Sequence, residues 1–360
     1  MQLKGLTPAG VLVGNSVQSM GFLGSLGSAF RGVIGGEIPT ITEMIHAGRE
    51  AAFERMVSEA AREGVHGVVG VTSELRGLAG NSEFLFVGSG VTGNGGMQKF
   101  TSAGDAQELY CHMDAGYQPI HFVFGNIAYA MGLIGGISGT LKTLIRGEIR
   151  EFSDIFNATR HHALDRLAAQ AKKAGANAVV GVRTSVIRFS GVHEMYMTGT
   201  AATHLSLPAE CTASPVTSDL TGEELWAMTS LGYAPVKLLI STSVYSLGAI
   251  GGFKAMLKGF VKGEIRELTT LIYDARENVF DRLKTEASDI GADEVVGIKT
   301  YIVELGSNLI EIVAVGTAVR KLPGFAVTTS ALPAQAIIRD KDTWLNGDGG
   351  FDLQSARAGN

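Results

Sequence analysis

The chain has 360 residues, a formal net charge of −5 and no basic stripe, which argues against a nucleic-acid-binding role. Only 18% of its residues are charged, below the roughly 25% of ordinary soluble domains, and 48 are glycines. The two cysteines form no CxxC motif, so we expect neither a disulfide nor a thiolate metal site, and we expect a reducing, cytoplasmic location. The low charge favours burial of apolar surface between repeats or subunits, although tight helix–sheet packing would also explain it.

One block of sequence occurs three times along the chain. It begins with Gly-Glu-Ile, continues through a helix-like segment and ends with Val-Val-Gly. The first two copies are 111 residues apart at both ends (37 to 148 and 70 to 181), and the second and third are 116 apart (148 to 264 and 181 to 297). Agreement at both ends excludes an insertion within the block, so the sequence indicates a tandem repeat of one folding unit.

Repeat one covers residues 9–93 and reads strand, helix, strand, strand. A short strand at 11–13 and a glycine-rich stretch at 21–36 precede a long helix, whose apolar residues recur three and four positions apart. Pro39 suits the first helical turn and Gly64 suits the C-terminal end. Strands are expected at 68–71 and 84–87, which gives an α+β domain of β-α-β-β order.

Repeats two (101–204) and three (217–321) have the same elements with an added short helix in front. For that helix, Thr221 and Glu224 form a capping-box pattern. Residues 322–360 depart from the repeat and form a C-terminal tail whose role the sequence leaves open.

Two runs without a charged residue, 122–141 and 238–252, raise the question of membrane insertion. A span of about 20 apolar residues can cross a bilayer. Both runs, however, contain glycines and small polar residues, and both divide into a strand-like piece and a loop-plus-helix piece. We therefore expect no membrane span, and reversible contact with a membrane surface stays open as an alternative.

The end of the block and the last strand carry recognisable motifs. Gly-Ala-x-x-Val-Val-Gly occurs at 175–181 and 291–297, and Gly-Thr-Ala follows at 199–201 and 316–318. In these motifs the chain resembles the YbjQ-like family, usually labelled a heavy-metal-binding domain. Repeat one departs from the pattern, with Val65 in place of the alanine and Gly-Val-Thr at 90–92, so its membership rests on the collinear spacing.

The resemblance implies a dodecin-like, two-layer β-α-β-β subunit that assembles into rings, typically pentamers. It covers most of residues 9–321 in three copies. It provides no ligand motif, so no metal-binding residue can be carried over to this sequence.

Several polar positions recur in all three repeats. They are Glu37, Glu148 and Glu264; Arg49, Arg160 and Arg276; and Arg55, Arg166 and Arg282. A glutamate in the first helical turn would complement the helix dipole. An arginine that binds a carboxylate of a neighbouring domain or subunit would fix the register of a ring. A solvated helix face and an anionic ligand site are the alternatives for the arginines.

The glycines that close the block are expected to be structural. They are Gly70, Gly181 and Gly297.

The sequence provides little evidence for site chemistry. None of the eight histidines recurs in all three repeats, and the best local metal candidate is His161 and His162 with Asp165 on one helix. No nucleophile motif, phosphate loop or acid–base pair recurs, so we expect no enzyme and no cofactor.

The favoured hypothesis is a non-enzymatic, self-assembling structural protein that partners with itself in a five-fold homo-oligomer. The alternatives are a metal or small-ligand binder with sites between subunits, and a membrane-surface scaffold.

Overall fold

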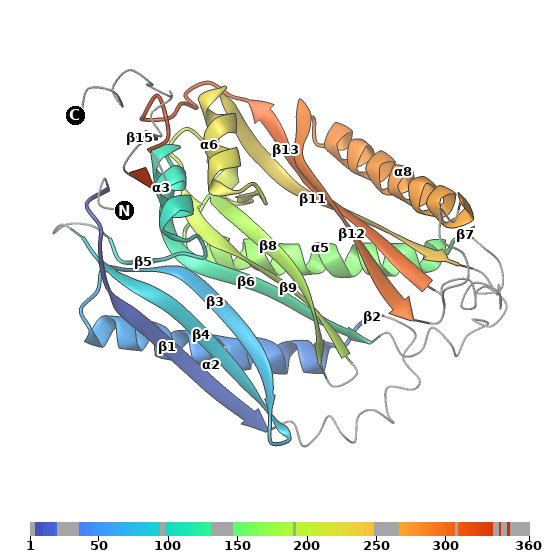
Figure 1. Ribbon diagram of the computed structural model, residues 1–360, viewed down its shortest axis with the longest axis horizontal. Coiled ribbons are helices and arrows are strands. Elements are labelled where there is room, and N and C mark those ends of the chain that lie inside the picture. The colour runs from blue at the N-terminus through green and yellow to red at the C-terminus, as the bar shows by residue number, and fades with distance from the viewer. Residues whose placement is uncertain are drawn as a thin grey trace.

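The structure is a computed structural model that describes residues 4–19, 36–93, 98–130, 147–189, 192–247, 266–306, 309–333, 338–339 and 344–345. The described residues form an α+β protein in which one β-rich unit occurs three times, each with a long helix and three long strands (Figure 1). Most of the glycine-rich stretch at 21–36, and the Gly-Glu-Ile segment of repeat three, lie outside the described residues.

The long elements keep the same order in each repeat. Repeat one contains β1 (Thr7–Ser19), α2 (Pro39–Arg62), β3 (Gly67–Leu78) and β4 (Asn81–Thr92). Repeat two contains β6 (Gln118–Ala130), α5 (Arg150–Lys173), β8 (Ala178–Phe189) and β9 (Val192–Thr203). Repeat three contains β11 (Tyr233–Ser246), α8 (Arg266–Asp289), β12 (Glu294–Gly306) and β13 (Leu309–Lys321).

Local chemistry explains where the first long helix begins and ends. Pro39 is its first residue, where the missing amide hydrogen leaves no helical bond unmade. Gly64 has φ +67°, the left-handed conformation that ends helices and that glycine adopts without strain. Both positions match the expectation, whereas β1 and β3 are longer than the predicted strands at 11–13 and 68–71.

The three glycines that close the repeated block sit at irregularities of the sheets. Gly70, Gly181 and Gly297 have φ values of +61°, +61° and +65°. In each repeat the register between the second and third long strands shifts across this glycine. This is the geometry of a β-bulge with glycine in the left-handed conformation, and it accounts for glycine in all three copies.

Short strands tie each repeat to the sheet of its neighbour. Gly36–Glu37 (β2) pairs with β6, and Gly147–Glu148 (β7) pairs with β11. Phe100–Thr101 (β5) pairs in parallel with β3, and Val216–Thr217 (β10) with β8. The resulting strand orders are β1-β4-β3-β5, β10-β8-β9-β6-β2 and β12-β13-β11-β7, so neighbouring repeats share sheets as well as surfaces.

Two capped short helices pack against each other at one end of the molecule. They are α3 (Ala106–Asp114) and α6 (Gly222–Ser230), and each begins with a capping box. Trp226 of α6 donates from Nε1 to Asp114 Oδ2 at 2.8 Å, and Lys4 forms an ion pair with the same carboxylate at 2.9 Å. Asp114 therefore joins the N-terminal segment, α3 and α6.

Sheets and long helices alternate as layers (Figure 1). The core around α2 includes Phe122 and Phe124 of β6 in addition to side chains of β1 and β4. The core around α5 likewise includes Leu238 and Ile240 of β11. Each of these helices is therefore covered by its own sheet on one side and by the next repeat's sheet on the other.

The described parts of the two uncharged runs lie in strands. Residues 122–130 belong to β6 and residues 238–246 to β11, with nearly all of their side chains buried. No helix among the described residues is long and apolar enough to cross a membrane. In the tail, Ile338–Arg339 (β14) pairs with Trp344–Leu345 (β15) in a two-stranded sheet.

Candidate functional site: the interfaces between repeats

A buried ion pair joins repeat one to repeat two. Arg49 on α2 donates from Nε and Nη2 to the two carboxylate oxygens of Glu194 on β9, at 3.1 and 2.7 Å. Its Nη1 donates to Ser73 Oγ at 2.6 Å, and its guanidinium lies 3.7 Å from the centre of the Tyr196 ring. Both charged side chains are almost fully buried. Burial alone would lower the pKa of Arg49, but Tyr196 and Glu194 together have a larger, opposite effect. The pKa is therefore raised, and the side chain stays charged.

The same pair recurs between repeats two and three. Arg160 on α5 donates from Nε to Glu311 Oε1 on β13 at 3.1 Å, and its Nη2 forms an ion pair with the same oxygen. The hydroxyl of Thr242 donates to that oxygen at 2.6 Å. Both charged side chains are again buried. Because a buried charge is tolerated only when it is paired and hydrogen-bonded, each of these two pairs fixes how one helix meets the next sheet.

A second arginine of each later repeat contacts the glutamate that precedes the helix of the repeat before it. Arg166 Nη2 lies 2.7 Å from Glu37 Oε1, and its Nη1 donates to the Asn126 carbonyl at 2.8 Å. Arg282 Nη2 lies 2.6 Å from Glu148 Oε1 in the same way. These pairs are partly exposed and lie at the rim of the buried interface.

The prediction that these glutamates lie in the first helical turn is wrong. Glu37 and Glu148 lie in the short strands β2 and β7, one residue before the N-cap positions Ile38 and Ile149. Pairing of β2 with β6 and of β7 with β11 holds this segment extended, so the helix begins later than its sequence pattern indicates.

The remaining members of the recurring set lie in the first and last repeats. Arg55 on α2 donates from Nη1 to the backbone carbonyl of Asn15 in its own repeat. Arg276 on α8 is exposed. Glu264 lies outside the described residues.

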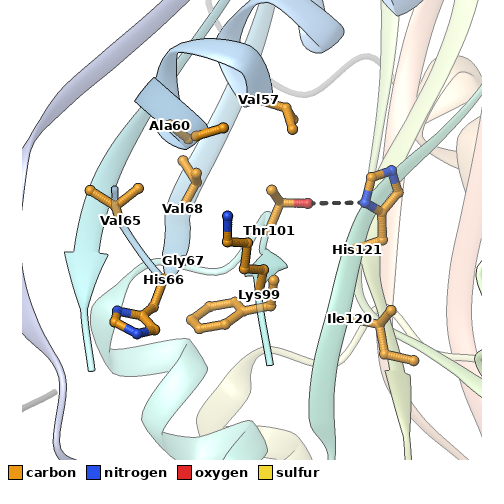
Figure 2. A pocket seen from close by; sticks show the side chains of 12 residues that line it. Val57, Ala60, Val65, His66, Gly67, Val68, Lys99, Thr101, Ile120 and His121 are labelled. Atoms are coloured by element: carbon orange, nitrogen blue, oxygen red, sulfur yellow. Dashed lines mark hydrogen bonds between the residues drawn. The ribbon is translucent and has the colours of Figure 1, made fainter. Parts of the chain in front are cut away.

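An apolar pocket of about 140 Å³ lies where repeats one and two meet, between the end of α2 and strands β3, β5 and β6 (Figure 2). Apolar side chains of α2 and β3 form one wall, and His66 and Lys99 contribute nitrogen atoms. Thr101 Oγ1 lies 3.4 Å from His121 Nδ1. Burial lowers the pKa of His121, so the ring is neutral near pH 7.

A larger cavity of about 370 Å³ continues this pocket along the same junction, since Ile120 and His121 line both. Its walls include Phe53 and Phe124, and Gln170 of α5 lies at its edge with its side-chain oxygen accepting from Phe124 N at 2.8 Å. The junction thus offers aromatic surface beside a few polar groups.

The corresponding place between repeats two and three is occupied by charged side chains. Lys237 stands in β11 where His121 stands in β6, and Glu286 stands in α8 where Gln170 stands in α5. Lys237 Nζ lies 2.8 Å from Glu286 Oε1, and His161 Nε2 lies 3.5 Å from the same oxygen. The contact with Glu286 raises the pKa of His161. The two junctions therefore share a buried ion pair but differ in their cavities.

Comparison with known proteins agrees with the threefold repeat. The model of the YbjQ family, described as "Putative heavy-metal-binding", matches residues 6–94, 116–204 and 234–321. The chain belongs to the YbjQ family.

Relatives of this YbjQ protein include one that matches more than half of the chain and others that match about the length of one repeat. An encapsulin nanocompartment protein of Mycobacterium tuberculosis is 28% identical over 233 residues, which cover 62% of this chain and 87% of the relative. A UPF0145 protein of Bradyrhizobium is 39% identical over 90 residues, covering 24% of this chain and 81% of the relative. A UPF0145 protein of Methanococcus vannielii is 40% identical over 86 residues, covering 23% and 80%.

The family description names heavy-metal binding. Among the described residues of this YbjQ protein, however, no group of three or more His, Cys, Asp or Glu side chains could hold a metal ion. The local candidate, His161 and His162 with Asp165, does not converge. His161 Nδ1 lies 2.8 Å from the Asn157 carbonyl, and its other ring nitrogen faces Glu286 of the next repeat. Both ring nitrogens therefore have polar neighbours within the protein.

The carboxylates of the buried pairs, Glu194 and Glu311, are not among the recurring polar positions predicted from the sequence. A signal was present, because Glu83 and Glu194 are 111 residues apart, the same offset as the repeated block. In repeat three, β12 is one residue longer than β8, and its register with β13 shifts between Glu304 and Gly306. This extra residue moves Glu311 to an offset of 117 from Glu194, so a comparison at the fixed spacing of 116 does not align the two glutamates.

Proposed function

We propose that this YbjQ protein is a non-enzymatic structural protein that assembles with copies of itself. The observation that carries the proposal is that one type of interface occurs twice within the chain. In both places a helix arginine forms a buried ion pair with a strand glutamate of the next repeat. A repeat unit that joins its neighbour in the same way each time is suited to extended or closed arrays.

The relatives support the same proposal. The Mycobacterium tuberculosis relative is described as an encapsulin nanocompartment protein, and it is similar to this chain over most of its own length. The UPF0145 relatives match a single repeat over about four-fifths of their length. We infer from this that the surfaces which join repeats within this chain are also suited to join repeats of separate chains.

The finer form of the proposal is a five-fold, cytoplasmic assembly built from dodecin-like units. Five chains with three repeats each would place fifteen repeats in one particle. The low fraction of charged residues favours this self-association, because obligate interfaces resemble a protein core more than an ordinary surface.

Light scattering coupled to size-exclusion chromatography tests the proposal directly. We expect a particle mass that is a whole-number multiple of the 37.8 kDa chain, unchanged on dilution into the micromolar range. Negative-stain electron microscopy of the same fraction should show rings or shells of uniform diameter. A single species of 37.8 kDa at micromolar concentration would end the proposal.

A second candidate function, small-ligand binding, is favoured by the cavity between repeats one and two. The cavity of about 370 Å³ offers the Phe53 and Phe124 rings beside Gln170 and Lys173, which suits a small aromatic carboxylate. The protein would be titrated with benzoate and indole-carboxylate probes by calorimetry. The variant His121→Lys/Gln170→Glu, which copies the charged second junction, serves as the control. Equal heats for the two proteins, or no heat at all, would count against this function.

A further inference from the structure

The outer face of the first sheet exposes residues whose counterparts are buried in the other sheets. In β1, Val11 and Val13 are 71% and 46% exposed. The residues at the same positions of β6, Phe122 and Phe124, are 1% and 3% exposed because α2 covers them. The equivalent residues of β11 are buried against α5. The first sheet thus presents the surface that elsewhere receives the helix of a preceding repeat.

The last repeat exposes the complementary surface. Tyr273 on α8 is 62% exposed, and Ile298 on β12 is 48% exposed. Ile298 corresponds to Val182 of β8, which is only 4% exposed. Arg276 is exposed on α8 at the position where α2 and α5 carry the buried arginines. Within the described chain, therefore, no following sheet packs on α8 as the sheets of repeats two and three pack on α2 and α5.

The first sheet also contains the carboxylate that this arginine position contacts. Glu83 pairs across the sheet with Val17, just as Glu194 pairs with Ala128 and Glu311 with Val244. Glu83 therefore occupies the same place and the same face as the two buried glutamates. It is half-buried, and its Oε1 accepts a hydrogen bond from Asn15 at 3.3 Å. The two ends of the chain carry opposite charges at matching positions of an interface that the chain already forms twice.

We propose that α8 and β12 of one chain pack on the outer face of β1 and β4 of a second copy, with Arg276 paired to Glu83 of that copy. This inference rests on the proposed function and specifies its contact. The contact is head-to-tail, because it joins two different surfaces. Its apolar residues, Tyr273 and Ile298 on one side and the β1 valines on the other, lose their exposure to water when it forms.

The proposed contact also limits the number of repeats that a closed ring can contain. Each chain adds three consecutive repeats, because its own two interfaces are of the same type as the proposed third. A ring closed in this way contains a number of repeats divisible by three. Two chains would form a ring of six repeats, whereas a ring of five repeats cannot be completed by whole chains.

Charge reversal at the two ends tests the contact. We expect Arg276→Glu and Glu83→Arg each to weaken assembly by about a hundredfold or more in dissociation constant, since each places like charges together in a buried contact. Native mass spectrometry and light scattering would measure the masses. Mixing the two variants should produce assemblies that contain both chains, because every contact between unlike chains again joins an arginine to a glutamate. A ring with an odd number of chains keeps one contact between like chains, so in that case the mixture should form open mixed assemblies.

A matched control is available on the same helix. Asp274 is exposed, and its counterpart on α5, Ala158, stays exposed although the next sheet covers that helix. Asp274→Arg should therefore leave the mass unchanged, and circular dichroism should show all variants folded. If the wild type is an assembly and both reversals leave it intact, or if mixing restores nothing, the proposed contact is wrong while self-assembly stands. A monomeric wild type would instead reject the proposed function.

Discussion

Replacing Arg49 by alanine isolates the contribution of one interface between repeats. The variant leaves Glu194 buried, with its two arginine hydrogen bonds removed. It also removes the hydrogen bond to Ser73 and the contact with the Tyr196 ring. The largest energetic cost comes from the Glu194 carboxylate, which stays buried without a partner. It keeps the desolvation penalty of burial but loses the attraction to the arginine that compensated for it.

Removing one partner of a buried ion pair costs about 3–5 kcal/mol. The individual losses are not additive, so the hydrogen bond to Ser73 adds no separate amount. The double variant Arg49→Met/Glu194→Leu removes both charges and fills the volume with apolar atoms. Such replacements are often neutral or stabilising by about 1–4 kcal/mol, so we expect the double variant to be at least as stable as the wild type.

Urea unfolding followed by circular dichroism, at one fixed protein concentration, would measure these differences. With a urea dependence of about 5 kcal/mol per molar, above the about 1–3 of small proteins because the slope increases with the surface exposed on unfolding, Arg49→Ala should lower the midpoint by about 0.6–1 M. Arg76→Ala is the control, because Arg76 and its partner Glu74 are more than half exposed, and such pairs contribute about 0–1 kcal/mol. If Arg49→Ala costs no more than Arg76→Ala, the buried pair does not hold the repeats together.

Three residues of repeat two, His112, Gly181 and Cys111, give further predictions. Burial, aided by Arg183, lowers the pKa of His112 to about 4. The unfolded chain therefore binds an extra proton between pH 6.5 and 4, and stability falls by about 3 kcal/mol as the pH drops through this range. His112→Met, which copies Met228 of α6, should remove this part of the pH dependence of the urea midpoint. Gly181→Ala should cost about 1–2 kcal/mol and lower the thermal midpoint, because φ is +61°. Burial raises the pKa of Cys111 to about 12, so an aromatic disulfide reagent at pH 8 should label it only after unfolding.

The parts of the fold that depend on local chemistry could be predicted from the sequence. Pro39 and Gly64 mark the ends of a helix because of what proline and glycine do to a backbone, wherever the rest of the chain lies. The repeat itself is a property of spacing, and it required no knowledge of the fold. The position of Glu37 in a strand depends instead on pairing with β6, a contact across more than ninety residues. A helix-period pattern contains no information about such a partner.

The site shows the same division between local and distant causes. The arginines that recur at one helix position can be identified from the sequence. The carboxylate that each arginine contacts, however, depends on which sheet packs against the helix. Glu194 is on a strand of the next repeat, 145 residues from Arg49. The cavity beside His121 was unpredictable for a related reason. It results from neutral residues, His121 and Gln170, where the second junction has the Lys237–Glu286 ion pair, and only the packed structure places these residues opposite each other.

Fusion of three repeats changes the physical problem of assembly. Two of every three interfaces in a head-to-tail ring are then formed within a chain, where the partner is present at an effective concentration set by the linking segments rather than by the amount of protein. Only the contact between α8 and the first sheet of another chain depends on protein concentration. That contact can be weaker than the buried Arg49–Glu194 and Arg160–Glu311 interfaces without loss of the ring. The partly exposed Glu83 and the exposed Arg276 fit a contact that has to form in water between chains that are already folded.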